Sequence, residues 1–346
     1  LSPDTRFDGW DGCSGYHYSD SIIYGFSHTH LSGTGVSDYG DLLIVPQNGK
    51  PRLEPGYSSK KGYQAKFSHI NEKASPGYYE VSLDDPKIDV RLTVAERSGM
   101  HEYTFKNKKG KKFILIDLDH RDELLSSSFN IVDNQTISGS RISKSWAEEQ
   151  HFYFYLEIDA PYQKARRIEK NGKHKLLLIF PKSTKKIKLR VAMSAVDIEG
   201  AKGNLAQEIT DWDFEKLHTM ALNKWNLELS KIKSSTSSNE IMTNFYTALY
   251  HSFIAPNIFN DVNGMYRGHD GKIHQLNPAK ENQYTVFSLW DTYRATHPLY
   301  TLTQVEKTND FINTFLRMYD QSGDLPVWEL AGNETECMIG YHSVSV

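Results

Sequence analysis

A change of hydrophobic period near residue 205 constrains the fold of this 346-residue chain more than any other feature. From about residue 20 to residue 200, short runs rich in β-branched and aromatic residues repeat with a period of two. Turn sequences such as Asp-Asp-Pro and Ser-Pro-Gly separate these runs. After residue 205 the apolar residues recur with the spacing of a helix. The sequence therefore predicts an all-β part followed by a helical part.

The β part contains about eleven predicted strands, among them HFYFYLEID (151–159) and HKLLLIFP (174–181). No helical pattern lies between them, which indicates antiparallel sheets packed face to face rather than a parallel sheet. We assign residues 1–204 to an N-terminal antiparallel β-sandwich domain.

The helical part begins with a stripe of apolar residues, which predicts a helical linker over residues 205–236; the stripe consists of Trp212, Leu217, Ala221, Trp225 and Leu229. Ser237 or Ser238 is placed to cap a second helix that ends near Pro256. Residues 257–283 carry several turn signals and are predicted to be a loop. Two further helices are predicted over residues 284–303 and 305–323.

Four or five helices are too few to close an α-toroid, which needs roughly twelve to bury every inner face against a neighbour. Residues 237–346 are therefore expected to form only the first part of such a domain, and the remaining helices are expected outside this chain.

Composition and charge exclude several classes of function. The net charge of −3, with dispersed Lys and Arg, gives no electrostatic footprint for nucleic acid. No run approaches the roughly 20 apolar residues of a membrane helix, so we expect a soluble chain. The sequence starts at Leu1 without an initiator Met or an apolar leader, which fits export followed by cleavage. Cys13 and Cys337 could form a bridge or stay reduced.

Two polar stretches in the β part could bind a ligand. Residues 8–20 have three glycines that would present Trp10 and Tyr16 on a loop, although a plain surface loop is an equal alternative. In residues 25–41, alternation places His28 and His30 on one strand face. A histidine pair at this spacing can bind a metal, but no third ligand is nearby. Hydrogen bonds to ligand hydroxyls or to a neighbouring domain, or a purely structural role, fit better.

Two further stretches lie in the helical part. If residues 284–303 are helical, Trp290, Asp291 and Arg294 share a face, and Asp291 could pair with Arg294 or bind two sugar hydroxyls. Residues 323–346 have no helical pattern, so their polar side chains could converge on a ligand; they include Trp328, Glu329, Asn333 and Glu334. A glutamate here could act as an acid or base if buried, or it could simply keep a loop soluble.

Together these stretches resemble glycoside hydrolase family 92, the exo-acting α-mannosidases of bacterial glycan-degrading systems. The matching segments occur in the family's order: SGYHYSDSIIYGFSHTHLSGTGVSDYGD, NFYTALYHSFIAPNIFNDVNGMYRGHDGKIH, YTVFSLWDTYRATHPLYTL and DLPVWELAGNETECMIGYHSV. The resemblance implies an N-terminal β-sandwich, a helical linker and the start of an (α/α)6 barrel. It also implies calcium-dependent, inverting removal of terminal α-linked mannose by an exported enzyme of the bacterial periplasm or cell surface.

The resemblance also implies that the catalytic acid, the base and the main calcium ligands come from later barrel helices, beyond residue 346. We therefore expect this chain to provide substrate-binding residues, with no metal ligands among them: Trp10, His28, His30, Trp290, Asp291, Arg294, Trp328, Glu329, Asn333 and Glu334. Two alternatives remain open. One is a metal-independent glycosidase or phosphorylase with the same architecture, and the other is a glycan-binding fragment without catalysis.

Overall fold

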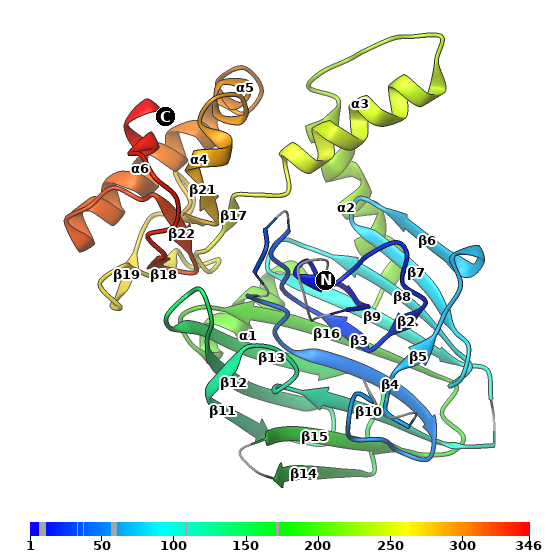
Figure 1. Cartoon of the computed structure of the whole chain (residues 1–346). Coiled ribbons are helices and arrows are strands. Elements are labelled where there is room, and N and C mark those ends of the chain that lie inside the picture. Colours follow the sequence, from blue (N-terminus) through cyan, green and yellow to red (C-terminus); the bar gives the residue numbers. More distant parts are fainter. Residues whose placement is uncertain (7–11, 33, 37, 57–60, 108, 171–172) are drawn as a thin grey trace.

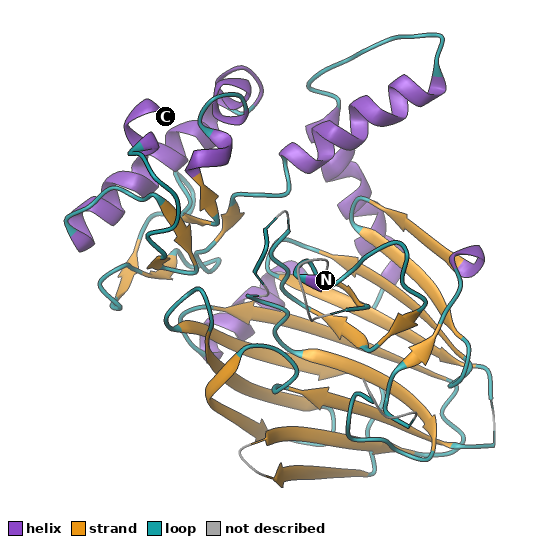
Figure 2. Cartoon of the chain, viewed as in Figure 1, coloured by secondary structure: helices purple, strands orange, loops and turns teal. Residues whose placement is uncertain are grey.

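The computed structural model of this chain describes residues 1–346 except 7–11, 33, 37, 57–60, 108 and 171–172. Two large β-sheets form the N-terminal part, and helices with short strands form the C-terminal part (Figures 1 and 2). The predicted order of a β-sandwich followed by helices is confirmed. Within the described ranges, no helix is both long enough and apolar enough to cross a membrane.

Both large sheets are antiparallel. The six-stranded sheet has the order β1 (Ser2–Asp4), β3 (Gly25–Ser27), β4 (Leu43–Gly49), β10 (Lys111–Asp117), β15 (Lys173–Phe180) and β14 (Lys164–Lys170). The eight-stranded sheet has the order β11 (Glu123–Ile131), β12 (Thr136–Lys144), β13 (Gln150–Ile158), β16 (Lys186–Ser194), β9 (Ser98–Phe105), β8 (Ile88–Val94), β7 (Tyr78–Leu83) and β6 (Glu72–Ser75). A small pair, β2 (Ile22–Ile23) and β5 (Ala65–Lys66), lies beside them, and the 3-10 helix η2 (His69–Asn71) precedes β6.

The sandwich core follows from the alternation in the sequence. Along β13, buried and half-buried residues alternate at every position, so Phe152, Phe154 and Leu156 all point inward. They meet residues of the opposite sheet such as Ile114 and Leu178 in one apolar cluster. This burial of one face of each sheet against the other is the main stabilising contribution to the domain.

A buried ionic network crosses the sandwich near the end that faces the helices. Arg141 on β12 is fully buried, and its Nη1 lies 2.6 Å from Asp41 Oδ1 and 2.7 Å from Ser143 Oγ. Its Nε donates to the Leu118 carbonyl at 2.8 Å. Asp41 also accepts from Thr29 Oγ1 at 2.8 Å. Because each charge is paired and hydrogen-bonded, the cost of taking it out of water is offset within the network.

Asp122 lies beside this network and makes stability depend on pH. Burial raises the pKa of Asp122 to about 8, although the charge of Arg141 opposes the shift. Between the usual carboxyl value of 3.8 and about 8, the folded chain keeps a proton that the unfolded chain releases, so stability is lost as pH rises through this window. Asp122→Asn cannot ionise, and we expect its melting temperature to fall less than that of the wild type between pH 5 and pH 8.

Thermal scans at these two pH values check this prediction, with Asp84→Asn, an exposed aspartate on the same sandwich, as the control. The control should follow the wild-type profile. Parallel pH profiles for the wild type and Asp122→Asn would contradict the assignment of the effect to Asp122.

The helical part starts earlier than the sequence pattern indicated. Helix α1 (Ile198–Glu208) begins within the range 1–204 that we assigned to the sandwich domain, and the sequence pattern did not predict it. Gly200 and Gly203 lower the helix propensity of this segment, and its sequence therefore did not predict a helix. The Asp197 side chain nevertheless caps it by accepting from the Gly200 backbone at 2.7 Å, and Leu205 is buried in the same cluster as Met100 of β9.

The next two helices match the prediction well. Helix α2 (Phe214–Leu229) buries Phe214, Leu217 and Ala221, the last two being part of the predicted stripe. Helix α3 (Asn239–Ser252) is capped by the side chain of Ser238, which accepts from the Ile241 backbone at 3.3 Å. Of the two proposed capping serines, Ser238 is therefore the one used.

The rest of the chain combines helices with short strands. The helices are α4 (Leu289–Thr292), α5 (Thr296–Thr303), α6 (Val305–Ser322) and the 3-10 helix η3 (His342–Ser345). The strand groups are β17 (Asn257–Ile258) with β20 (Tyr284–Thr285), β18 (Met265–Arg267) with β19 (Ile273–Gln275), and β21 (Phe287–Ser288) with β22 (Trp328–Leu330) and β23 (Asn333–Glu334). Helix α6 confirms the predicted helix over 305–323. The last segment follows the predicted non-helical path through β22 and β23, but it ends in the 3-10 helix η3, which was not predicted.

Two predictions for this part are wrong. The predicted loop over 257–283 contains three short strands, and the predicted helix over 284–303 is instead two strands and two short helices. Its first residues pair with distant segments, because β20 pairs with β17 and β21 pairs with β22. Val286 has a positive φ of 69°, which a helix does not allow. Tertiary pairing therefore overrides the local helical spacing.

The sandwich and the helical part share buried contacts. An apolar cluster joins Leu31 and Ala147 of the sandwich to Trp328 and Leu330 of the helical part. Asp261 accepts from Ser194 Oγ and Asn204 Nδ2, both at 2.7 Å. These contacts place the loops at one end of the sandwich against the strands that carry the C-terminal polar residues.

Candidate active site

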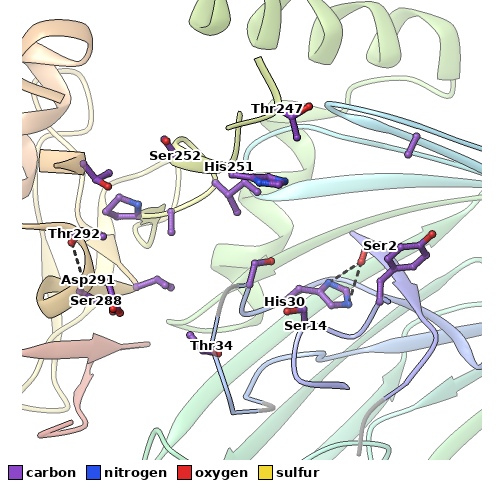
Figure 3. Close-up of a pocket in the computed structure, with 18 of the residues that line it drawn as sticks. Ser2, Ser14, His30, Thr34, Thr247, His251, Ser252, Ser288, Asp291 and Thr292 are labelled. Atoms are coloured by element: carbon purple, nitrogen blue, oxygen red, sulfur yellow. Dashed lines mark hydrogen bonds between the residues drawn. The ribbon is translucent and has the colours of Figure 1, made fainter. Parts of the chain in front are cut away.

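A cleft of about 1360 Å³ separates the sandwich from the helical part and is lined by both (Figure 3). From the sandwich side, His30, Ser14 and Thr34 reach it. From the end of α3 come Thr247, His251 and Ser252, and from α4 and the residues before it come Ser288, Asp291 and Thr292. A junction between domains is a common position for a ligand site.

One wall of the cleft is built on α4. Leu289 is fully buried and packs with Phe287 and Phe315, which fixes this four-residue helix against α6. Ser288 donates its hydroxyl to Asp291, and Thr292 Oγ1 donates to the Ser288 carbonyl at 2.8 Å. Asp291 is thus an exposed carboxylate held in position at the cleft wall. Such a group can accept hydrogen bonds from two neighbouring sugar hydroxyls.

Trp328 lines the same cleft at the start of β22. Only 2% of its surface is exposed, and its ring packs on Trp146 of the sandwich, with centroids 4.6 Å apart. The backbone nitrogens of Trp146 and Ala147 donate to the Asp38 carboxylate at 3.1 and 2.9 Å. The tryptophan pair therefore connects the two halves at the base of the cleft, with part of Trp328 facing the cavity.

His30 lines the opposite wall, where residues of β1 and β3 hold its ring. Ser27 Oγ lies 2.9 Å from Nε2, and the buried Asp4 carboxylate lies 3.4 Å from the same nitrogen. Burial lowers the pKa of His30, although Asp4 opposes the shift. For Asp4, burial would raise the pKa, but hydrogen bonds from His120 and His30 and the charge of Arg121 bring it well below its usual range. His30 therefore faces the cleft as a neutral ring beside a fixed carboxylate.

His28 does not share this position, contrary to the alternation-based prediction. It follows the end of β3, its Nε2 lies 2.8 Å from His101 Nε2, and it does not belong to the cleft lining. Burial lowers the pKa of His28 well below its usual value. In the structure His28 is part of a buried contact within the sandwich.

The grouping of Trp290, Asp291 and Arg294 on one helix face is also wrong. Helix α4 ends at Thr292 and α5 begins at Thr296, so Arg294 falls between two helices. Its Nη2 donates to Tyr293 Oη at 3.2 Å, while Asp291 takes the Ser288 hydroxyl. Trp290 is 41% exposed and makes an edge contact with His342. Of these three residues, only Asp291 reaches the cleft.

Glu329 serves as a backbone anchor. It is fully buried, and its Oε1 accepts from Thr285 Oγ1 at 2.9 Å and from the Gly332 backbone at 2.7 Å. Its Oε2 accepts from the Val286 backbone at 2.9 Å. The carboxylate thus holds the strained residue Val286 and the adjoining strands in place, behind the wall that carries Asp291.

Asn333 and Glu334 also brace the backbone and lie outside the cleft lining. Asn333 exchanges hydrogen bonds with the backbone of Glu149 in the sandwich, at 3.2 Å in each direction. Glu334 accepts from the backbone nitrogens of Val327 and Trp328, both at 2.9 Å. Trp10, the remaining predicted residue, lies outside the described residues. The structure therefore brings His30, Asp291 and Trp328 together in one cleft.

Sequence reasoning missed His297 on α5. It is 3% exposed, lines the cleft, and lies among the rings of Tyr300, Phe311 and Phe315. Burial lowers its pKa to about 4, and its Nδ1 has no hydrogen-bond partner within the described structure. A neutral imidazole with an open nitrogen at a cleft wall can bind a ligand hydroxyl. The only sequence signal was a histidine on the otherwise apolar side of a helix.

A second group lies on the sandwich rim of the cleft and comprises Tyr16, Tyr18, His69, Glu72 and Tyr79. The sequence predicts Tyr16 on a candidate ligand-binding loop, but it does not single out the other four. These residues come from separate turns and strands, so no local pattern connected them. Among the described residues, no group of three or more His, Cys, Asp or Glu is arranged to hold a metal ion.

Comparisons with known proteins give a consistent result. The N-terminal domain model of glycosyl hydrolase family 92 matches residues 1–194, and the catalytic domain model of that family matches residues 200–346. A family GH92 alpha-mannosidase from Bacteroides thetaiotaomicron shares 36% identity and a TM-score of 0.92, over 99% of this chain and 49% of its own chain. The family GH92 inverting mannosidase from strain VPI-5482 of that species shares 26% identity and a TM-score of 0.85, over 98% of this chain and 46% of its own.

Among curated proteins, an uncharacterized secreted glycosidase of Arthroderma benhamiae (strain ATCC MYA-4681 / CBS 112371) is 25% identical over 326 residues. That match covers 83% of this chain and 41% of the fungal protein. The chain therefore spans about half or less of the length of the relatives that it matches.

Proposed function

Because this chain belongs to glycosyl hydrolase family 92, we propose that it forms the N-terminal part of an exo-acting α-mannosidase that removes terminal α-linked mannose from glycans. The observation that carries this proposal is the cleft between the sandwich and the helical part, where Asp291, His30 and His297 face one cavity. A carboxylate and neutral imidazoles are suited to bind the hydroxyls of a single sugar ring. Two relatives whose names state mannosidase activity support the choice of mannose.

We further propose that the reaction proceeds with inversion, as the name of one relative states for that protein. In inverting hydrolysis, one carboxylic acid protonates the departing oxygen while a carboxylate activates water on the opposite ring face, and the two lie about 6.5 to 9.5 Å apart. We propose that the catalytic acid and the catalytic base both lie outside these 346 residues. Asp291 then binds the sugar, and Glu329 supports the wall from behind.

The domain division remains a proposal: a sandwich over residues 1–204, a linker over 205–236 and the first part of an (α/α)6 barrel over 237–346. The remaining barrel helices would come from sequence outside this chain. We also propose export to the periplasm or cell surface of a bacterium; the secreted fungal relative supports export in general.

Calcium dependence is part of the proposal on the basis of family resemblance. We propose that the main calcium ligands come from outside this chain; the described residues hold no group of three or more His, Cys, Asp or Glu arranged for a metal ion. We expect a calcium chelator to lower the α-mannosidase activity of the full-length protein at least about tenfold, and added calcium to restore it. Unchanged activity in the chelator, or a requirement for phosphate, would instead favour a metal-independent glycosidase or a phosphorylase.

Hydrolysis of α-mannobiose by the full-length protein tests the proposed function itself, with the anomer of the released mannose followed by NMR. We expect β-mannose as the first product, because inversion at an α-linkage gives the opposite anomer. Assays of the 346-residue chain alone should show no hydrolysis. Glycan binding without hydrolysis by the full-length protein would favour the non-catalytic alternative.

A further inference from the structure

The sandwich rim of the cleft carries its own group of aromatic and polar side chains. We call Tyr18 and His69, together with the residues that hold them, Tyr16, Glu72 and Tyr79, the Tyr18 platform. All five line the same cleft as Asp291. Tyr18 stacks on the His69 ring, with centroids 4.2 Å apart and an interplanar angle of 15°.

Glu72 holds the platform together. Its side chain is 8% exposed, and it accepts three hydrogen bonds: from Tyr79 Oη at 2.5 Å, from Tyr16 Oη at 3.1 Å and from His69 Nδ1 at 2.5 Å. Burial and the Glu72 charge raise the pKa of both tyrosines, so their hydroxyls remain protonated donors. The ring of His69 is therefore fixed in orientation, and it offers a rigid base for the Tyr18 ring.

Tyr18 itself is not packed into a core. It is 70% exposed, although it lines a cleft and is supported by a fixed imidazole on one face. An exposed aromatic face beside fixed polar groups is the chemistry that binds a sugar ring, which has an apolar face and a hydroxyl-bearing edge. The hydrogen bond to Glu72 raises the pKa of His69, so the platform also presents a polarised imidazole.

In this chain the cleft is larger than a pocket for one small ligand. Pockets for a single drug-sized ligand have volumes of about 300 to 1,000 Å³, and this cleft measures about 1360 Å³. The α4 wall with Asp291 and the Tyr18 platform belong to different halves of the chain, and both face this volume. The two sets of residues can therefore contact different parts of one glycan.

We propose that the Tyr18 platform binds a sugar unit of the glycan on the leaving-group side of the terminal mannose, with that ring stacked on Tyr18. This inference rests on the proposed function. The platform then contributes to the choice of glycan, while the α4 wall holds the mannose that is removed.

Two substrates separate these roles in the full-length protein. Alpha-mannosyl fluoride has no sugar on the leaving-group side, whereas α-mannobiose has one. For Tyr18→Ala we expect KM for mannobiose to rise about tenfold. The ratio of kcat/KM for mannobiose to kcat/KM for mannosyl fluoride should therefore fall about tenfold as well. Tyr18→Phe keeps the aromatic ring, so its ratio of the two kcat/KM values should stay close to that of the wild type. Ile70→Ala is the matched control, since Ile70 is 91% exposed next to His69 but does not line the cleft.

The outcomes distinguish the platform from the proposed function. Suppose that the wild type cleaves both substrates and that Tyr18→Ala has the same ratio of kcat/KM for mannobiose to kcat/KM for the fluoride. The platform proposal is then overturned and the α-mannosidase proposal stands. This holds whether the two kcat/KM values stay at the wild-type level or fall by the same factor. If the wild type cleaves neither substrate, the proposed function fails, and the platform proposal fails with it.

Discussion

Replacing Asp291 by Ala should lower kcat/KM for α-mannobiose hydrolysis by the full-length protein about a hundredfold. Hydrogen bonds to a charged group contribute about 1.5 to 3 kcal/mol each, and 1.36 kcal/mol corresponds to a tenfold change in rate. Asp291 is positioned to make such bonds because Ser288 holds it and the buried Leu289 anchors its helix. Steady-state kinetics of the variant checks this result.

The matched control for this prediction is Asp320→Ala, which removes an exposed carboxylate from α6 without touching the cleft. We expect its kcat/KM to stay within about twofold of the wild type, as for most surface substitutions. Circular dichroism should show that both variants are folded. A folded Asp291→Ala enzyme with wild-type kcat/KM would remove Asp291 from the sugar site.

Arg141→Leu is expected to be the most destabilising single change in the sandwich. It leaves Asp41 buried without its main partner, and removal of one member of a buried ion pair costs about 3 to 5 kcal/mol. For a domain of this size we expect the sandwich transition to shift down by about 10 °C. Differential scanning calorimetry of the full-length protein measures this shift.

Arg167→Leu provides the comparison, because Arg167 is exposed and its Nη2 donates to the Phe129 carbonyl at 2.8 Å. Its transition should move by no more than about 2 °C. A similar small shift for both variants would show that the Arg141 network adds little to stability.

The fold was predictable wherever local patterns and tertiary contacts agree. The alternation of apolar residues predicted strand β13, and the serine before residue 239 predicted the start of helix α3; the structure has both. Prediction failed over residues 284–303 because β20 and β21 pair with strands that lie far away along the chain. It also failed at α1, where glycines that are typical of turns lie within a helix capped by Asp197.

The candidate site was predictable only in part. Residue type and spacing selected Asp291, His30 and Trp328, which line the cleft. The same criteria selected Glu329, because a buried carboxylate that accepts backbone hydrogen bonds cannot be told from a ligand-binding one by sequence.

The contacts and residues that prediction missed are those that only the fold brings together. Tyr16 and Glu72 are 56 positions apart, and their hydrogen bond exists because the loop near the start of the chain packs beside β6. His297 is recognisable only once its ring is seen to be buried at the cleft wall.

We propose that the sandwich and the helical part together form the cleft that holds the terminal mannose. The most direct test is a crystal structure of the full-length protein with a mannose-configured inhibitor. We expect sugar hydroxyls within hydrogen-bonding distance, about 2.7 to 3.2 Å, of Asp291, and the sugar ring in the space between α4 and His30. An inhibitor bound outside this cleft, with Asp291 making no contact to it, would contradict the claim.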